Sequence, residues 1–194
     1  PYGLLRALGE RHEAFGILHI DAHRDLREAY EGFEYSHASV MYNVLRDVPQ
    51  VTRLVQVAVR DFSEREAQLA ERSERVVSFE DGALAAAGFE GVSWGEQCRR
   101  IVEALPQLVY VSFDIDGLSF DNCPDTGTPV NGGLSFNQAI YLLDVLVRSG
   151  RRIVGFDVVE VVPRTEVRIN AITGARVLWK LCGKTLKSNP AVER

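Results

Sequence analysis

Residues 16–25 read Gly-Ile-Leu-His-Ile-Asp-Ala-His-Arg-Asp, so an apolar run passes directly into a cluster of charged and imidazole side chains. A run that is apolar at nearly every position is typical of a strand buried on both faces, and such strands belong to parallel sheets. We therefore expect a buried strand over 15–20, with Asp21, His23 and Asp25 at its carboxyl end.

Four further runs rich in Val, Ile and Phe have the same character, at 53–59, 75–79, 108–113 and 152–159. Segments with helical spacing lie between them, at 36–46, 63–71, 94–105, 135–149 and 171–186, and a helix-like segment opens the chain at 1–11. This alternation predicts an α/β fold with helices on both faces of a mainly parallel sheet. No linker or internal repeat interrupts it, so we expect a single domain over residues 1–194.

The composition favours a protein that acts on a small molecule. Of the 194 residues, 46% are hydrophobic and 25% are charged, and the formal net charge is -5. The sequence has no cluster of Lys and Arg that would track a nucleic acid, and no apolar run near the ~20 residues of a membrane span. Cys98, Cys123 and Cys182 are an odd number without a Cys-x-x-Cys pair, which favours a reducing compartment. We expect a cytoplasmic protein with no nucleic-acid or membrane partner.

Three of the expected strands run directly into acidic clusters. Asp21 to Asp25 follow the first run, Asp114 and Asp116 follow the run at 108–113, and the sequence Asp-Val-Val-Glu at 157–160 closes the last. In open α/β sheets the ligand site lies outside the carboxyl ends of the strands. If the sheet is parallel, these clusters converge on one rim.

Residue spacing within these clusters is typical of a metal site. Asp21, His23 and Asp25 share one face if their segment is extended, because side chains of a strand repeat with a period of two. Asp114 and Asp116 are spaced in the same way. Carboxylates gathered in a poorly solvated cleft repel one another unless cations compensate them. Carboxylate-rich sites with an imidazole suit Mn²⁺, and paired sites hold two ions about 3.5 to 4 Å apart. Either motif alone is more typical of a solvated loop or a helix cap, but the two together, at the ends of two expected buried strands, favour a metal site.

Five motifs together resemble those of the arginase and agmatinase ureohydrolases in order and spacing. They are Asp-Ala-His-Arg-Asp at 21–25, Ser-Phe-Asp-Ile-Asp-Gly-Leu at 112–118, Thr-Gly-Thr-Pro at 126–129, Gly-Gly-Leu at 132–134 and Asp-Val-Val-Glu-Val at 157–161. The resemblance runs from about residue 1 to about residue 187. It implies a three-layer α/β/α sandwich, hydrolysis of a guanidino C–N bond with two Mn²⁺ ions, and a homo-oligomer, either a trimer or a hexamer.

The same resemblance implies a ligand set. Asp21 and Asp114 would bridge both Mn²⁺ ions, Asp25 would bind one ion, and His23 and Asp116 would bind the other. The family's sixth ligand, a histidine in a Gly-Gly-Asp-His motif, has no counterpart here. That motif precedes a segment resembling residues 1–5, so we expect the chain to lack the N-terminal part of the family's domain.

Three further residues acquire expected roles from the resemblance. His37, in Tyr-Ser-His-Ala-Ser at 35–39, would pass a proton to the leaving amine, although a helix-start residue capped by Ser36 is the alternative. Glu160 would accept the guanidinium through both carboxylate oxygens. Thr128 would line the substrate pocket. For Arg24, an ion pair with a nearby carboxylate is favoured over a contact with an acidic group of the substrate.

The segments 25–32 and 36–39 look like the agmatinase branch of the family. Agmatine, hydrolysed to putrescine and urea, is therefore the expected substrate, which would place the reaction in polyamine biosynthesis. Formimidoylglutamase, guanidinobutyrase and arginase activities are the alternatives within the family. A catalytically silent metal-binding module is the alternative outside enzymes, because one metal-ligand histidine has no counterpart.

Overall fold

The computed structural model describes residues 1–162 and 168–190 and contains a parallel sheet. Its strands are β1 Phe15–Ile20, β2 Val51–Val57, β3 Val76–Phe79, β4 Leu108–Asp114 and β5 Arg152–Val159. They lie in the order β3-β2-β1-β4-β5, and each neighbouring pair is parallel. The expectation of a mainly parallel sheet is confirmed, and β1 and β5 have the predicted bounds.

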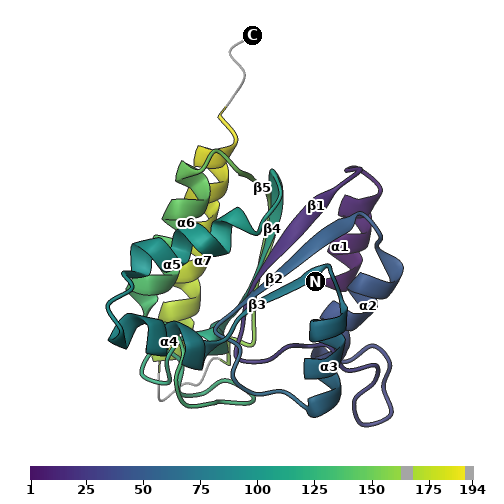
Figure 1. The fold of residues 1–194 in the computed structure, drawn as a ribbon, viewed down its shortest axis with the longest axis horizontal. Coiled ribbons are helices and arrows are strands. Elements are labelled where there is room, and N and C mark those ends of the chain that lie inside the picture. Colours follow the sequence, from purple (N-terminus) through teal and green to yellow (C-terminus); the bar gives the residue numbers. More distant parts are fainter. Residues whose placement is uncertain (163–167, 191–194) are drawn as a thin grey trace.

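Helices cover both faces of this sheet (Figure 1). One layer holds α1 Tyr2–Gly9, α2 Val40–Asp47 and α3 Glu64–Arg72, and the opposite layer holds α4 Asp81–Phe89, α5 Trp94–Glu103, α6 Phe136–Arg148 and α7 Ile169–Ser188. Two short 3₁₀ helices, η1 His37–Ser39 and η2 Ile115–Gly117, follow the first loop and β4. The predicted three-layer α/β/α architecture is therefore correct.

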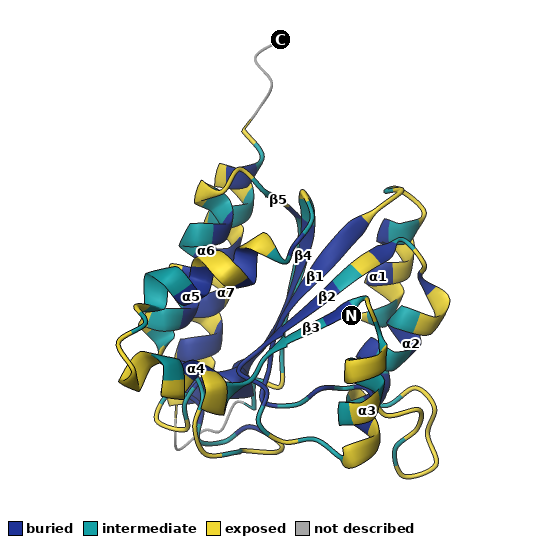
Figure 2. Ribbon diagram, in the orientation of Figure 1, coloured by how far each residue is buried: buried dark blue, intermediate teal, exposed yellow. Residues whose placement is uncertain are grey.

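Burial on both sides of β1 explains its apolar sequence. Phe15 and Ile17 pack into the cluster beneath α1 and α2, whereas Leu18 and Ile20 pack into the larger cluster beneath α4 to α7. Figure 2 shows the central strands as continuously buried between exposed outer helix faces. A strand with apolar neighbours on both faces has no position left for a solvated side chain.

The order of the strands fixes where a site can form. From β1 the chain moves outward through β2 and β3, and then returns to place β4 on the other side of β1. The ends of β1 and β4 lie side by side, with Ile20 opposite Phe113. Connections that leave neighbouring strands in opposite directions open a crevice at the carboxyl edge, which is the usual ligand position in such folds.

The structure corrects several predicted elements. Helix α4 was not predicted, because its sequence Asp-Gly-Ala-Leu-Ala-Ala-Ala-Gly-Phe has no amphipathic spacing and buries only Leu84. The strand predicted at 53–59 spans Val51–Val57 instead, and it ends where Ala58 adopts a left-handed φ of 72°. The helix predicted from residue 36 begins as the 3₁₀ turn His37–Ser39.

The last helix, α7, packs on β5 and α6 through residues that include Val177 and Leu181. Its outer face leaves Trp179 and Leu186 about three-quarters exposed, at 74% and 75%. Within the described residues, none of the helices has both the length and the apolar run that crossing a bilayer demands.

Candidate metal centre

The acidic side chains after β1 converge through a turn. Strand β1 ends at Ile20, and Asp25 adopts a left-handed φ of 54°. This turn is held by the Asp25 carbonyl, which accepts the backbone N–H groups of Met41 and Tyr42, both at 3.1 Å. Asp25 therefore departs from the extended conformation expected for residues 21–25, whereas His23 forms a parallel bridge with Asp61, and the three side chains do come together.

The same correction applies to the second motif. Strand β4 ends at Asp114, and Asp116 lies in the 3₁₀ turn Ile115–Gly117 rather than on the strand. The turn is stabilised by the Asp114 carboxylate, whose Oδ1 accepts the backbone N–H of Asp116 at 2.9 Å. A carboxylate that caps the turn in this way places the next one beside it.

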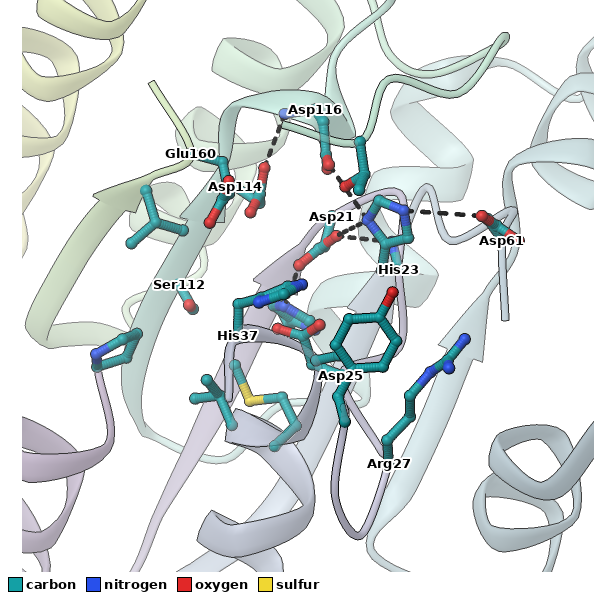
Figure 3. A pocket seen from close by; sticks show the side chains of 18 of the residues that line it. Asp21, His23, Asp25, Arg27, His37, Asp61, Ser112, Asp114, Asp116 and Glu160 are labelled. Atoms are coloured by element: carbon teal, nitrogen blue, oxygen red, sulfur yellow. Dashed lines mark hydrogen bonds and ion pairs between the residues drawn. The ribbon is translucent and has the colours of Figure 1, made fainter. Parts of the chain in front are cut away.

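One cavity of about 210 Å³ lies at the crevice between β1 and β4. All the residues that sequence analysis proposed for the site line it, namely Asp21, His23, Asp25, His37, Asp114, Asp116, Thr128 and Glu160. Figure 3 shows the labelled carboxylates and imidazoles directed into a common space from separate segments of the chain. The structure thus brings together the residues that the motifs singled out.

His23 and Asp116 form one half of the centre. The His23 Nδ1 atom lies 3.2 Å from Asp116 Oδ2 and 3.4 Å from Asp21 Oδ1. The backbone N–H of His23 donates to Asp21 Oδ1 at 2.6 Å, and that of Ala22 donates to Asp116 Oδ1 at 3.0 Å. Backbone amides therefore hold both carboxylates in place.

His19 belongs to the other half, and sequence analysis missed it. This side chain is 1% exposed, and its Nε2 atom lies 2.7 Å from Asp21 Oδ2. His19 stands two positions before Asp21, on the same face of β1. The alternation of polar residues at 21, 23 and 25 continues back to His19 and could have identified it. His19 was overlooked because it lies inside an apolar run.

Burial and crowding govern the pKa values of the carboxylates. Burial raises the pKa of Asp25 and of Asp114 well above the ordinary value, and the neighbouring Asp21 carboxylate raises both further. Burial would also raise the pKa of Asp21, but its contacts with His19 and His23 outweigh it, so that pKa is lowered. Burial lowers the pKa of His23, and its contacts with Asp116 and Asp21 reverse this and raise the pKa to about 10.

The donor set fits divalent cations. His19, Asp21 and Asp25 form one group whose candidate ligand atoms lie within 4.8 Å of one another, and Asp21, His23 and Asp116 form a second, so Asp21 is common to both. The buried Asp116 Oδ2 faces His23 Nδ1 at 3.2 Å and has no other polar partner within the described part of the chain. Hard carboxylate oxygens with imidazole are the ligands that Mn²⁺ accepts.

Residues at the rim of the cavity come from other loops. His37 opens the turn His37–Ser39, and its ring meets the edge of the Tyr30 ring with centroids 5.3 Å apart. Among described residues no side-chain hydrogen bond caps this turn, because the Ser36 hydroxyl pairs with that of Ser39 at 2.8 Å. Glu160 follows β5 directly with a left-handed φ of 57° and lines the cavity.

Two arginines lie outside the cavity and hold the segments around it. Arg24 is buried away from the cavity and pairs with Glu80, which agrees with the ion pair favoured from the sequence. Arg60 donates hydrogen bonds to backbone carbonyls that join the end of β2, the turn after β4 and the loop before residue 133. These carbonyls belong to Ala58, Asp116, Leu118, Val130 and Asn131.

Comparison with known proteins relates this geometry to a family. The family model described as "Arginase family" matches residues 1–183. An N(1)-aminopropylagmatine ureohydrolase of Thermus thermophilus is 36% identical over 178 residues, which cover 91% of this chain and 55% of that protein. An agmatinase of Neisseria gonorrhoeae is 34% identical over 181 residues, covering 92% and 54%.

A solved structure shows the same fold. Proclavaminate amidino hydrolase from Streptomyces clavuligerus superimposes with a TM-score of 0.79 at 26% identity, covering 97% of this chain and 61% of that one. The chain thus spans about half the length of the curated relatives that it matches.

Proposed function

The chain belongs to the arginase family, and on that basis we propose that it forms the metal-binding core of a hydrolase that cleaves guanidino C–N bonds, with agmatine as its substrate. The products would be putrescine and urea, in a step of polyamine biosynthesis. One observation carries the proposal: four carboxylates and an imidazole from two separate strand ends line one cavity at the β1–β4 crevice.

The proposed cofactor is a pair of Mn²⁺ ions. Asp21 and Asp114 would be shared by both ions, Asp25 would hold one, and His23 and Asp116 would hold the other. Two bound cations supply a lowered pKa for water and compensate the carboxylate charge. The raised pKa values of Asp25 and Asp114 support this role, because the metal-free cluster carries more negative charge than its surroundings stabilise.

The chain's own residues would bind the substrate and move the proton. Glu160 would accept the guanidinium N–H groups, and Thr128 would border the substrate opposite the metal centre. His37, held against Tyr30, would donate a proton to the leaving amine. These roles are supported by the lining of a single cavity by all three side chains.

A second candidate keeps the reaction and changes the substrate. Arg27 lines the same cavity with a side chain that is 42% exposed, and its Nε lies 3.4 Å from the Glu66 carboxylate, with which a substrate carboxylate would compete. A guanidinium at this position would favour a substrate that carries a carboxylate, such as guanidinobutyrate. The Thermus relative is instead named for the polycation aminopropylagmatine. Which substrate the chain hydrolyses therefore distinguishes the two candidate functions.

The test is urea release by the Mn²⁺-loaded chain from agmatine, N(1)-aminopropylagmatine, guanidinobutyrate, arginine and formimidoylglutamate, with metal content measured in parallel. We expect agmatine to be hydrolysed fastest, and Asp114→Ala to abolish release. Asp144→Ala, on α6 and outside the cavity, is the matched control and should retain activity.

Other results would favour a different substrate or a different function. A preference for guanidinobutyrate that Arg27→Gln removes would select the carboxylate substrate. Two bound metals without turnover of any substrate would favour the catalytically silent module. A chain that binds no metal would overturn the proposed centre.

A further inference from the structure

A buried polar chain runs from the sheet to the metal centre. His19 on β1 and Gln56 on β2 are paired in register, and the Gln56 amide nitrogen lies 3.2 Å from His19 Nδ1. The same nitrogen donates to the Arg24 backbone carbonyl at 2.8 Å. At the far end, His19 Nε2 lies 2.7 Å from Asp21 Oδ2. Gln56, His19 and Arg24 are 0%, 1% and 3% exposed, so water does not compete for these contacts.

The orientation of the Gln56 amide is determined by Arg24. A backbone carbonyl only accepts hydrogen bonds, so the group facing the Arg24 carbonyl must be the amide NH₂. The amide oxygen then faces the Arg24 guanidinium, with Nη1 at 3.3 Å, and the Ser78 hydroxyl at 3.5 Å. The flipped amide would set NH₂ against a guanidinium, which has only donors, and oxygen against a carbonyl.

A fixed amide determines the tautomer of His19. Because the Gln56 NH₂ points at Nδ1, that ring nitrogen is the acceptor, and the ring proton of the neutral imidazole lies on Nε2. The Nε2–H group then donates to Asp21 Oδ2. A ring nitrogen that carries a proton has no free lone pair for a metal ion.

We propose that His19 is a positioning residue that orients the Asp21 carboxylate, with Gln56 and Arg24 fixing its tautomer, and that it is not itself a metal ligand. This inference rests on the proposed function, in which Asp21 is shared by two metal ions. The alternative is that His19 binds the metal directly, because it forms a group with ligand spacing together with Asp21 and Asp25.

The positioning role follows from the contacts of Asp21. His19 fixes Oδ2, and the backbone N–H of His23 fixes Oδ1 at 2.6 Å. Together they set the rotation of the carboxylate plane. Partners that orient a ligand in this way typically contribute about 10- to 100-fold to metal affinity.

The first test reads the tautomer without metal or substrate. In metal-free chain with ¹⁵N-labelled histidine rings, with the His19 signals assigned from the spectrum of His19→Gln, we expect a protonated Nε2 and an unprotonated Nδ1. A proton on Nδ1 instead would overturn the inference, whatever the chain does with metal.

The second test measures Mn²⁺ affinity, which the positioning role and the ligand role predict to change in opposite directions. Gln56→Leu removes the NH₂ group that keeps Nδ1 an acceptor, so the ring proton can move to Nδ1 and leave Nε2 without a donor for Asp21. As a positioning residue, His19 would then lose its effect, and Mn²⁺ affinity measured by calorimetry should fall about 10- to 100-fold. If His19 were a ligand, the same change would free its lone pair, and unchanged or tighter binding would overturn the inference.

Matched variants separate these effects from general damage. Gln97→Leu makes the same change at a buried glutamine of α5 and should leave Mn²⁺ affinity within a few-fold of wild type. His19→Gln retains an N–H donor and should bind Mn²⁺ more tightly than His19→Leu, whereas equal losses would contradict the donor role. A wild-type chain that binds no Mn²⁺ would overturn the proposed function and the positioning role with it, while the ring spectrum decides the tautomer independently.

Discussion

Asp114 is buried among carboxylates, and its ionised form is costly when no cation is bound. Burial, followed by the Asp21 carboxylate, raises its pKa in the folded chain well above the ordinary value of 3.8. Between these two pKa values the folded chain binds more protons than the unfolded chain. The stability of the metal-free protein therefore falls as pH rises from about 3.8 through the folded pKa.

Asp114→Asn should consequently stabilise the metal-free chain at pH 8. Asparagine keeps an oxygen that can accept the Asp116 N–H, but it carries no charge. We expect a gain of about 1 kcal/mol, or roughly 2–4 °C in Tm, measured by thermal denaturation in EDTA. The gain should vanish near pH 3, where the unfolded carboxyl is also protonated, and a variant that is less stable at both pH values would contradict the charge argument.

His37 is the rim residue with the clearest chemical expectation. His37→Ala should lower the rate of urea release by about 100- to 10,000-fold, because the leaving amine loses its positioned proton donor. Metal content should stay at the wild-type level. His12→Ala, in the loop before β1, is the matched control and should retain activity. Loss of bound metal in His37→Ala would instead make His37 a ligand.

Sequence patterns predicted which side chains line the cavity more reliably than they predicted the backbone conformation that places them there. Asp21, His23 and Asp25 were selected by a two-residue period, yet their convergence depends on the left-handed Asp25 and its carbonyl contacts with α2. Those contacts join segments far apart in the sequence, so local spacing does not encode them. The role of His19 depends likewise on Gln56, a neighbour only in the folded sheet.

At the level of elements, Gly117 determines how the turn after β4 packs on the end of β1. A Cβ atom at this position would lie 2.7 Å from the Asp21 backbone nitrogen and 2.9 Å from Ile20 Cγ2. Backbone atoms cannot yield as a flexible side chain does. Only glycine lets the turn Ile115–Gly117 approach closely enough for Asp116 to meet the Ala22 N–H.

Gly117→Ala should therefore push the two strand ends apart. We expect a loss of about 1–3 kcal/mol in the free energy of unfolding, measured by urea denaturation, together with weakened Mn²⁺ binding. Gly82→Ala in α4 is the matched control, since no described atom lies within 4 Å of its added Cβ. That change should be neutral or stabilise by up to about 1 kcal/mol. Equal effects of both changes would exclude the close approach as the cause.

The positions of the strands were predicted better than the residues at which they end or the conformation of the polar turns. Apolar runs located each of the five described strands, and β1 and β5 were correct to the residue. Burial on both faces explains the signal of β1 and β4, whereas β3 and β5 are apolar although most of their residues are only partly buried. Local backbone geometry ended β2 early, at the left-handed Ala58. Helix α4 gave no signal, because alanine and glycine supply neither an apolar stripe nor a polar face.

In the molecule as a whole, the proposed metal centre joins two halves of the sheet. Asp21 and Asp25 follow β1, from which the chain continues through β2 and β3, whereas Asp114 and Asp116 follow β4 on the other side of the crevice. Ions held by both sets would therefore connect segments that are otherwise joined by the hydrogen bonds of β1 to β4 and by the packed cores. Metal binding should accordingly raise the stability of the fold, in addition to any role in catalysis.

Mn²⁺ at a hundredfold excess over its dissociation constant should stabilise the chain by about 2.7 kcal/mol, or roughly 5 to 10 °C in Tm, and EDTA should reverse the effect. Ligand carboxylates must be ionised, and the pKa values of Asp25 and Asp114 are raised in the metal-free chain, so binding releases protons. Affinity should therefore increase as pH rises through those pKa values. Calorimetry at pH 6, 7 and 8 in buffers of different ionisation enthalpy measures both the affinity and the protons released, and an affinity independent of pH would show that these carboxylates are already ionised before the metal binds.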